Sequence, residues 1–149
     1  MARKLQLLVI HCTDTPAGRE VTKADIQKWH LVERGWRELG YSDLIHLDGS
    51  IENLVPFDQD DTVDNWEITN GARGYNTIAR HLAYAGGING IDTRTSAQKY
   101  ALEIYVKYMI LRHPDIKICG HCKLSFKHCP SFNVTMWLLS IGIPHHNIK

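Results

Sequence analysis

Eleven residues near the C-terminus carry the densest chemistry of this 149-residue chain. The stretch from Gly120 to Pro130 holds two histidines, two cysteines and two lysines. Imidazole and thiolate groups suit Zn²⁺, and a catalytic zinc site has three protein ligands and an open position for water. His121 and Cys129 are eight residues apart, too far for one helical turn. A loop that folds back, which Pro130 fits, would bring them together.

A third zinc ligand must come from elsewhere in the chain, and His11 is the best candidate. It follows the short apolar run from Leu5 to Ile10, which predicts a buried central strand. Residues at the carboxyl ends of strands in α/β sheets commonly face the functional crevice. A single histidine in such a place is also often a hydrogen-bonded structural residue, so position alone leaves both roles open.

The same stretch supports a competing redox hypothesis. The residues from Cys119 to Cys122 form a C-x-x-C pattern that resembles the tetrapeptide of disulfide isomerases. A thioredoxin-like pair lies after an early strand, at the start of a helix, with further strands to come. Only 27 residues follow Cys122, and they indicate a loop, a helix and a tail. Loop thiols and imidazoles without any joint role are a third interpretation.

Length and composition predict one domain with a sizeable core, since 44% of the residues are apolar and 22% are charged. A net charge of +1 gives no reason to expect a nucleic-acid partner, and no apolar run approaches membrane-spanning length. The apolar run after the basic N-terminus is too short for a signal peptide. We therefore expect a monomer that is made in the cytoplasm, with thiols or metal ligands rather than structural disulfides.

Start and turn signals divide the first half of the chain. Thr22 and Asp25 predict the start of a helix that carries Trp29 and His30 and ends at Gly35. Strands are expected over residues 41–47 and 50–55, joined by a turn at residues 48–49. The acidic stretch from residue 58 to 64 predicts a surface loop and lacks the ligand spacing of a calcium loop.

In the second half, Thr95 and Gln98 form a capping box that opens a long helix, which should stop before Pro114. Residues 78–84 fit a helix or a strand by pattern. A short strand over residues 116–118, a last helix over residues 132–139 and a tail with His145 and His146 complete the chain. The apolar residues expected to share one face of the long helix are Ala97, Tyr100, Ala101, Ile104, Tyr105, Tyr108 and Leu111.

Several of these segments together resemble a known family. Residues 9–16, Val-Ile-His-Cys-Thr-Asp-Thr-Pro, look like the opening motif of the zinc N-acetylmuramoyl-L-alanine amidases of the phage-lysozyme and peptidoglycan-recognition-protein type. The resemblance covers about residues 5 to 140. The further matches, in order, are Ile26–His30, Arg34–Trp36, Gly40–Tyr41, Asp48–Gly49, Gly74–Asn76, Thr95 with Gln98, Gly120–His121, and Lys127 with Cys129–Phe132.

The resemblance implies a single amidase domain over residues 1–149, an α/β fold whose mixed central sheet is flanked by helices, and zinc in a surface cleft. It makes residues 78–84 a strand. It implies that His11, His121 and Cys129 are the Zn²⁺ ligands and that Tyr41 and Lys127 are the catalytic side chains. The implied reaction is hydrolysis of the amide bond between N-acetylmuramic acid and the L-alanine of the peptidoglycan stem peptide. With no signal peptide expected, the simplest setting is cell-wall lysis by a phage or prophage endolysin that acts on the wall after release. Cytoplasmic recycling of wall fragments and delivery by a secretion machine also fit.

Two positions depart from the family pattern. Many members carry histidine where this chain has Ser42 and where it has Gly71, so the substrate contacts are open; His46 or His81 are the residues that would compensate. Binding-only relatives resemble the enzymes but lack the cysteine ligand. A non-catalytic peptidoglycan-binding module is therefore the alternative, followed by a thiol–disulfide oxidoreductase that uses Cys119 and Cys122.

Overall fold

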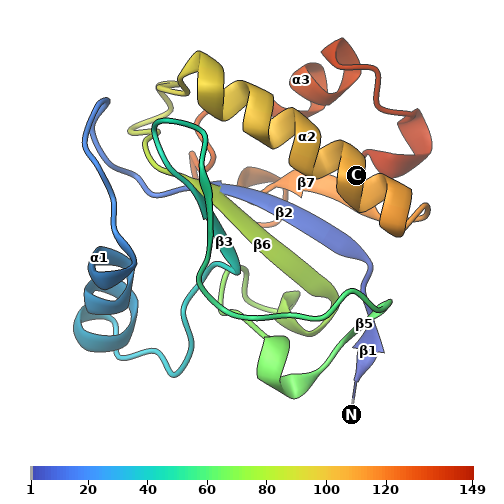
Figure 1. The fold of residues 1–149 in the computed structure, drawn as a ribbon, viewed down its shortest axis with the longest axis horizontal. Helices are drawn as coiled ribbons and strands as arrows, with labels where there is room; N and C mark the ends of the chain where they lie inside the picture. Colours follow the sequence, from blue (N-terminus) through green and yellow to red (C-terminus); the bar gives the residue numbers. More distant parts are fainter. Residues whose placement is uncertain (1) are drawn as a thin grey trace.

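A five-stranded sheet crosses the molecule and has helices on both faces (Figure 1). The structure is a computed structural model, and it describes residues 2–149. Four neighbouring strands of this sheet run parallel and β4 runs antiparallel at one edge, which confirms the predicted single-domain α/β fold with a mixed central sheet. In spatial order the strands are β4 (Ile51–Asn53), β3 (Asp43–Ile45), β6 (Ala79–Tyr84), β2 (Leu7–Cys12) and β7 (Lys117–Gly120). The strands β1 (Arg3–Lys4) and β5 (Thr62–Val63) pair separately.

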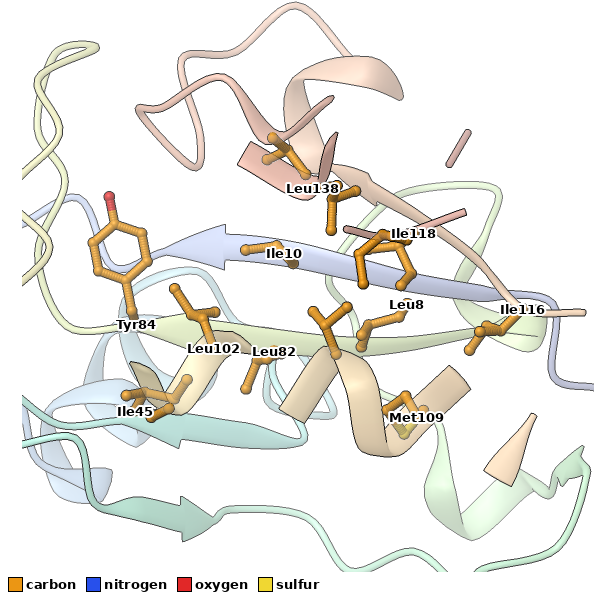
Figure 2. Packing of buried hydrophobic residues seen from close by; sticks show 14 of the residues in the cluster. Leu8, Ile10, Ile45, Leu82, Tyr84, Leu102, Met109, Ile116, Ile118 and Leu138 are labelled. Carbon is orange, nitrogen blue, oxygen red and sulfur yellow. The ribbon is translucent and has the colours of Figure 1, made fainter. Parts of the chain in front are cut away.

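The central strand β2 sends alternate side chains to opposite faces of the sheet, as period-two geometry requires. Leu8 and Ile10 join the larger core beneath α2, where Figure 2 shows them packed near Leu82. Leu7 and Val9 point to the other face, and His11 follows them there. The strand begins two residues later than the sequence predicted, because the backbone of Leu5 bonds to Asp61 outside the sheet. His11 therefore lies within the strand rather than beyond its end.

The long helix α2 (Ser96–Arg112) begins and ends as predicted. Thr95 and Gln98 form the reciprocal capping box, and the helix stops two residues before Pro114. The side chain of Gln98 is fully buried, and its Nε2 donates to the Ala85 carbonyl at 2.9 Å. This hydrogen bond joins the first turn of the helix to the end of β6.

The predicted apolar face of α2 is wrong for most of its members. Tyr100, Ile104, Tyr108 and Leu111 are exposed, whereas Ala101 is buried. Apolar residues occur on more than one face of the helix. The face that carries Gln98 is the one that packs on the sheet, and the buried hydrogen bond of Gln98 belongs to this packing. Figure 2 shows Leu102 and Met109 from that face above the sheet. The buried residues are Gln98, Ala101, Leu102, Val106 and Met109.

The first helix keeps its predicted start but changes type halfway. Thr22 and Asp25 form a capping box for α1 (Lys23–Gln27). The chain then continues as a π-helical segment over Lys28–Glu33, and Gly35 follows with a positive φ of 67°. Single π-turns are frequent at functional sites because they shift side chains around the helix. This one places Trp29 and His30 on the wall of a cleft.

The acidic loop after β4 folds around a buried carboxylate. Glu67 accepts hydrogen bonds from the backbone N–H groups of Asp58 and Asp64, at 2.8 Å each. The Arg80 guanidinium lies 4.0 Å from the same carboxylate. These contacts give the acidic stretch a structural role. The predicted surface loop is interrupted by β5, where Val63 is buried and pairs with Arg3 of β1.

The C-terminal segment is packed rather than loose. Asn133 caps α3 (Val134–Ser140). Asn147, fully buried, donates to the carbonyls of Pro114 and Ile116 at 2.8 Å each. The predicted tail is therefore folded, although His145 and His146 are exposed. The 3-10 turns are Asn65–Glu67, Asn76–Ile78, His121–Lys123 and His145–Asn147. No helix within residues 2–149 is long and apolar enough to cross a membrane.

The two leucines of α2 test the corrected helix face. Leu102→Ala should lower the free energy of unfolding by about 2–5 kcal/mol, because a fully buried leucine is removed from a packed core. Leu111→Ala, at a side chain that is 78% exposed, should change it by less than about 0.5 kcal/mol. Urea unfolding of both variants measures the difference, and equal losses would contradict the packing of α2.

Candidate active site

The parallel register of β2 and β7 brings two histidines together. Val9 lies opposite Cys119 in this register, so the residues two positions further on are His11 and His121. Their rings are 4.6 Å apart between centroids. Both side chains are buried and lie on the sheet face opposite α2. Sequence reasoning paired these residues by metal chemistry, and the strand register supplies the geometric reason.

Cys129 reaches the same place through the loop after β7, which folds back. The backbone N–H of Cys122 donates to the Cys129 carbonyl at 2.7 Å and closes this loop. The backbone N–H of Cys12 donates to the Cys129 Sγ at 3.2 Å. A thiolate is stabilised by such a donor. Gly120 permits the close approach, since a Cβ there would lie 2.8 Å from the Pro130 Cδ.

The donor set fits a tetrahedral zinc ion. The ligand atoms of His11, His121 and Cys129 all lie within 4.8 Å of one another. The Cys129 Sγ lies 3.7 Å from the His11 Nδ1. Two ligands at ordinary Zn–S and Zn–N bond lengths and a tetrahedral angle are about 3.5 Å apart. Three converging protein ligands leave a fourth position for water or substrate.

Burial keeps the two candidate histidine ligands neutral. Desolvation, and next the nearby Lys127 charge, lower the pKa of His121 to about 4. Desolvation, followed by the neighbouring imidazoles and Lys127, lowers the pKa of His11 well below its usual value. Neutral imidazoles offer a lone pair at pH 7, so a metal ion displaces no proton from them. A side-chain hydrogen bond with the Cys12 thiol, and next burial, raise the pKa of the Cys129 thiol, whereas the Cys12 backbone N–H acts in the opposite direction. A bound cation would also lower this pKa.

Tyr41 lies beside the histidines, just before β3. Its hydroxyl donates to the Cys12 carbonyl at 3.3 Å, and its ring is 5.3 Å from that of His11. Burial raises the pKa of the phenol well above its usual range, so the hydroxyl stays protonated. The predicted side chain is thus held as a neutral hydroxyl group at the edge of the three-ligand cluster.

Lys127 lies on the loop that delivers Cys129, and it is exposed. It lines the same cleft as His11 and His121, and its charge is close enough to lower the pKa of both. The structure therefore places all five sequence-predicted site residues around one cleft. The cleft has a volume of about 1010 Å³, and Trp29, Arg34, Trp36 and Arg73 also line it.

Comparison with known proteins shows the family of the chain. Residues 1–132 match the family model described as N-acetylmuramoyl-L-alanine amidase. The chain belongs to this family. It is 30% identical to the endolysin of Enterobacteria phage K11 over 133 residues, which is 87% of this chain and 82% of the endolysin. By family, the chain is an amidase.

Solved structures share the amidase fold. The N-acetylmuramoyl-L-alanine amidase LysC from Clostridium intestinale URNW superposes with a TM-score of 0.74 at 22% identity, covering 95% of this chain and 87% of that one. A variant of Drosophila PGRP-LB in complex with tracheal cytotoxin superposes with a TM-score of 0.73 at 21% identity, covering 97% and 89%. At these identities the likeness concerns the fold.

The two departures from the amidase pattern have different structural outcomes. Ser42 is buried and is not among the residues that line the cleft. Gly71 lines the cleft, and a Cβ on it would lie 2.4 Å from the His81 ring. His81 is the neighbour of His11, whereas His46 pairs with Glu52 at 2.9 Å.

Sequence reasoning missed most of the residues that support the amidase ligands. From the sequence, His81 is only a candidate replacement for a missing histidine, and Asn76 is only part of a loop motif. Asn76 bonds to His81 at 2.9 Å, and His81 bonds to His11 at 2.8 Å. The sequence gives only a weak signal for this contact. His81 lies two residues before Ala83, which pairs with His11, so both side chains are on the same face of the strand. Only the pairing of β6 with β2 places it beside His11.

Cys119 and Cys122, the pair of the redox hypothesis, do not suit a redox site. Cys119 is buried on the inner side of β7, and burial raises the pKa of its thiol to about 11. Reactive cysteines of redox enzymes have lowered pKa values. Cys122 is exposed on the following 3-10 turn, and neither residue belongs to the three-ligand group.

The metal centre predicts one zinc ion per chain. Cys129→Ser should weaken zinc binding by more than the roughly 10- to 100-fold that loss of an outer hydrogen-bond partner costs, because a thiolate ligand itself is removed. Cys122→Ser, at an exposed thiol, should bind zinc like the unchanged protein. Isothermal titration of metal-free protein gives stoichiometry and affinity. Equal weakening by both substitutions would contradict the ligand assignment.

Proposed function

We propose that this amidase hydrolyses the amide bond between N-acetylmuramic acid and L-alanine in peptidoglycan, with Zn²⁺ held by His11, His121 and Cys129. The observation that carries the proposal is the convergence of these three donors within 4.8 Å at a cleft of a chain from the amidase family. The endolysin and the peptidoglycan-recognition fold among its relatives support the same substrate class.

The cleft is large enough for a glycopeptide. Its volume of about 1010 Å³ lies at the upper end of the range for drug-sized ligands, so it takes more than one amino acid. The tryptophans at its wall offer apolar faces to a sugar or peptide, and the arginines offer charge to a carboxylate. A segment that contains both the muramyl group and the first stem residues would fill such a space.

Zinc, when bound, supplies Lewis-acid chemistry that polarises the scissile carbonyl and brings a bound water to a pKa of about 7. The Lys127 ammonium, which lines the cleft, would stabilise negative charge on the carbonyl oxygen as that charge develops. Because the charge is absent in the ground state, this contact favours the transition state selectively. One preorganised donor of this kind contributes about 3 kcal/mol.

The Tyr41 hydroxyl is neutral and fixed by the Cys12 carbonyl. In this proposal it orients the attacking water or passes its proton onward. Tyr41 and Lys127 lie on different segments, so the two groups can act on different atoms of the substrate.

We propose an endolysin role, in which the protein is made in the cytoplasm and acts on the wall after release. The relation to a phage endolysin over 87% of this chain supports this setting. Peptidoglycan is the expected partner. We expect no nucleic-acid partner and a monomeric protein.

Lys127→Ala tests the role of the ammonium. Turnover of peptidoglycan should fall by about 100-fold or more while zinc content is unchanged, because Lys127 is not a ligand. The loss should appear in kcat more than in KM. Lys123→Ala, which removes an exposed lysine outside the cleft, is the matched control and should keep full activity. Loss of zinc, or wild-type kcat, in Lys127→Ala would refute the assigned role.

Tyr41→Phe keeps the ring beside His11 but removes the hydroxyl. We expect zinc content to persist and kcat to fall by about 100-fold, within the range of acid–base contributions. Steady-state kinetics and metal analysis on the same sample measure this. If the unchanged protein binds the wall without any turnover, even with zinc, the binding-module alternative replaces the enzyme.

A further inference from the structure

A chain of hydrogen bonds leads from the cleft rim to the proposed ligand His11. It begins at Asn76, whose Oδ1 accepts the backbone N–H groups of Gly71 and Ala72 at 3.0 and 2.9 Å. A backbone N–H can only donate, so this side-chain atom must be the oxygen of the amide. The Asn76 Nδ2 then faces the Asn70 Oδ1 at 3.2 Å, which agrees with that orientation.

The orientation of Asn76 determines the proton position on His81. The His81 Nε2 lies 2.9 Å from the Asn76 oxygen, so Nε2 carries the proton and donates it. The ring is fully buried, and its two hydrogen-bond partners among residues 2–149 are the uncharged groups of Asn76 and His11. A neutral imidazole has one N–H, so the His81 Nδ1 is an acceptor.

The same logic continues to His11. The His11 Nε2 lies 2.8 Å from the His81 Nδ1, so His11 donates from Nε2. Its Nδ1 is then free of a proton and presents a lone pair. That atom is the one 3.7 Å from the Cys129 Sγ, on the side where the ligands converge.

We propose that His81, held by Asn76, is a positioning residue that fixes the tautomer and ring orientation of His11 for metal binding. The inference rests on the proposed zinc site. Metal-bound histidines usually donate their second N–H to a carboxylate, carbonyl or water. Here the acceptor is a second, neutral imidazole, which adds no charge to the site.

Space for the His81 ring depends on Gly71. A Cβ at this position would lie 2.4 Å from both Cγ and Nδ1 of the ring, and 2.7 Å from the Gly40 carbonyl oxygen. The imidazole at residue 81 therefore occupies space that a side chain at residue 71 would need. The Gly71 backbone N–H also fixes the Asn76 oxygen that begins the chain.

Two substitutions of His81 test whether its hydrogen-bond acceptor or its volume matters for zinc binding. His81→Asn keeps an acceptor oxygen close to where Nδ1 lies, whereas His81→Leu removes it at similar volume. We expect His81→Leu to weaken zinc binding by about 10- to 100-fold and His81→Asn to stay within a few-fold of the unchanged protein. His46→Leu, at a histidine outside the cleft, is the control and should bind zinc normally.

The tautomer is measured directly in metal-free protein by long-range ¹⁵N–¹H NMR of the histidine rings. The unchanged protein should show His11 and His81 both protonated on Nε2, and the His11 Nε2–H signal should exchange slowly in His81→Asn but not in His81→Leu. A proton on the His11 Nδ1, or equal zinc affinity for the Leu and Asn variants, would overturn the proposal. If His81→Leu does not fold, the His11 tautomer in the unchanged protein and the zinc affinity of His81→Asn still test the proposal.

The same experiments distinguish this proposal from the zinc assignment. If the unchanged protein and His11→Ala bind zinc equally, the assigned metal site fails, whatever tautomer His11 adopts. If His11→Ala loses zinc while both His81 variants keep it, the site stands and the positioning role of His81 fails.

Discussion

The site depends on the parallel register of β2 with its two neighbours. Val9 lies opposite His81 on one side and opposite Cys119 on the other. His11, two residues later on the same face, is thereby placed between His81 and His121. A slip of one residue would turn every β2 side chain to the opposite face. The register is held by apolar alternation, with Leu8 and Ile10 beneath α2 and Leu7 and Val9 on the other face.

Three imidazoles are buried close together at this site, and burying polar rings costs free energy. The structure offsets this cost with hydrogen bonds between neutral groups. Burial lowers the pKa of His81 to about 3, chiefly through desolvation. Unpaired buried polar groups cost about 1–3 kcal/mol each, so such rings need hydrogen bonds. Asn76 and the His11–His81 contact supply them for two of the three rings, those of His81 and His11. Burial therefore favours neutral imidazoles in this corner. In the proposed mechanism, the charges come from the metal ion, Cys129 and Lys127.

The sequence predicted what is encoded locally and missed what depends on pairing between distant strands. The capping boxes at Thr22 and Thr95 and the hairpin at Asp48–Gly49 were right, because each is a short-range backbone requirement. The buried stripe of α2 was wrong, because two stripes are apolar and one distant contact of Gln98 selects between them. The five site residues, at one cleft, came from metal chemistry and family motifs. His81, which supports His11, lies 70 positions away from it in the sequence, so only the tertiary structure brings the two residues together.

The C-terminal loop is the part of the site that a metal ion would change most. Cys129 is joined to β2 through the Cys12 N–H and to the start of its own loop through the Cys122 N–H. The loop is thus already closed by two backbone donors, and a ligand bond would add a third link to the sheet. Lys127 lies two residues before Cys129, so whatever orders the cysteine also limits where the ammonium can point. The proposed ligand Cys129 and the proposed catalytic group Lys127 therefore lie on the same short loop, while β2 contributes His11 from the central sheet.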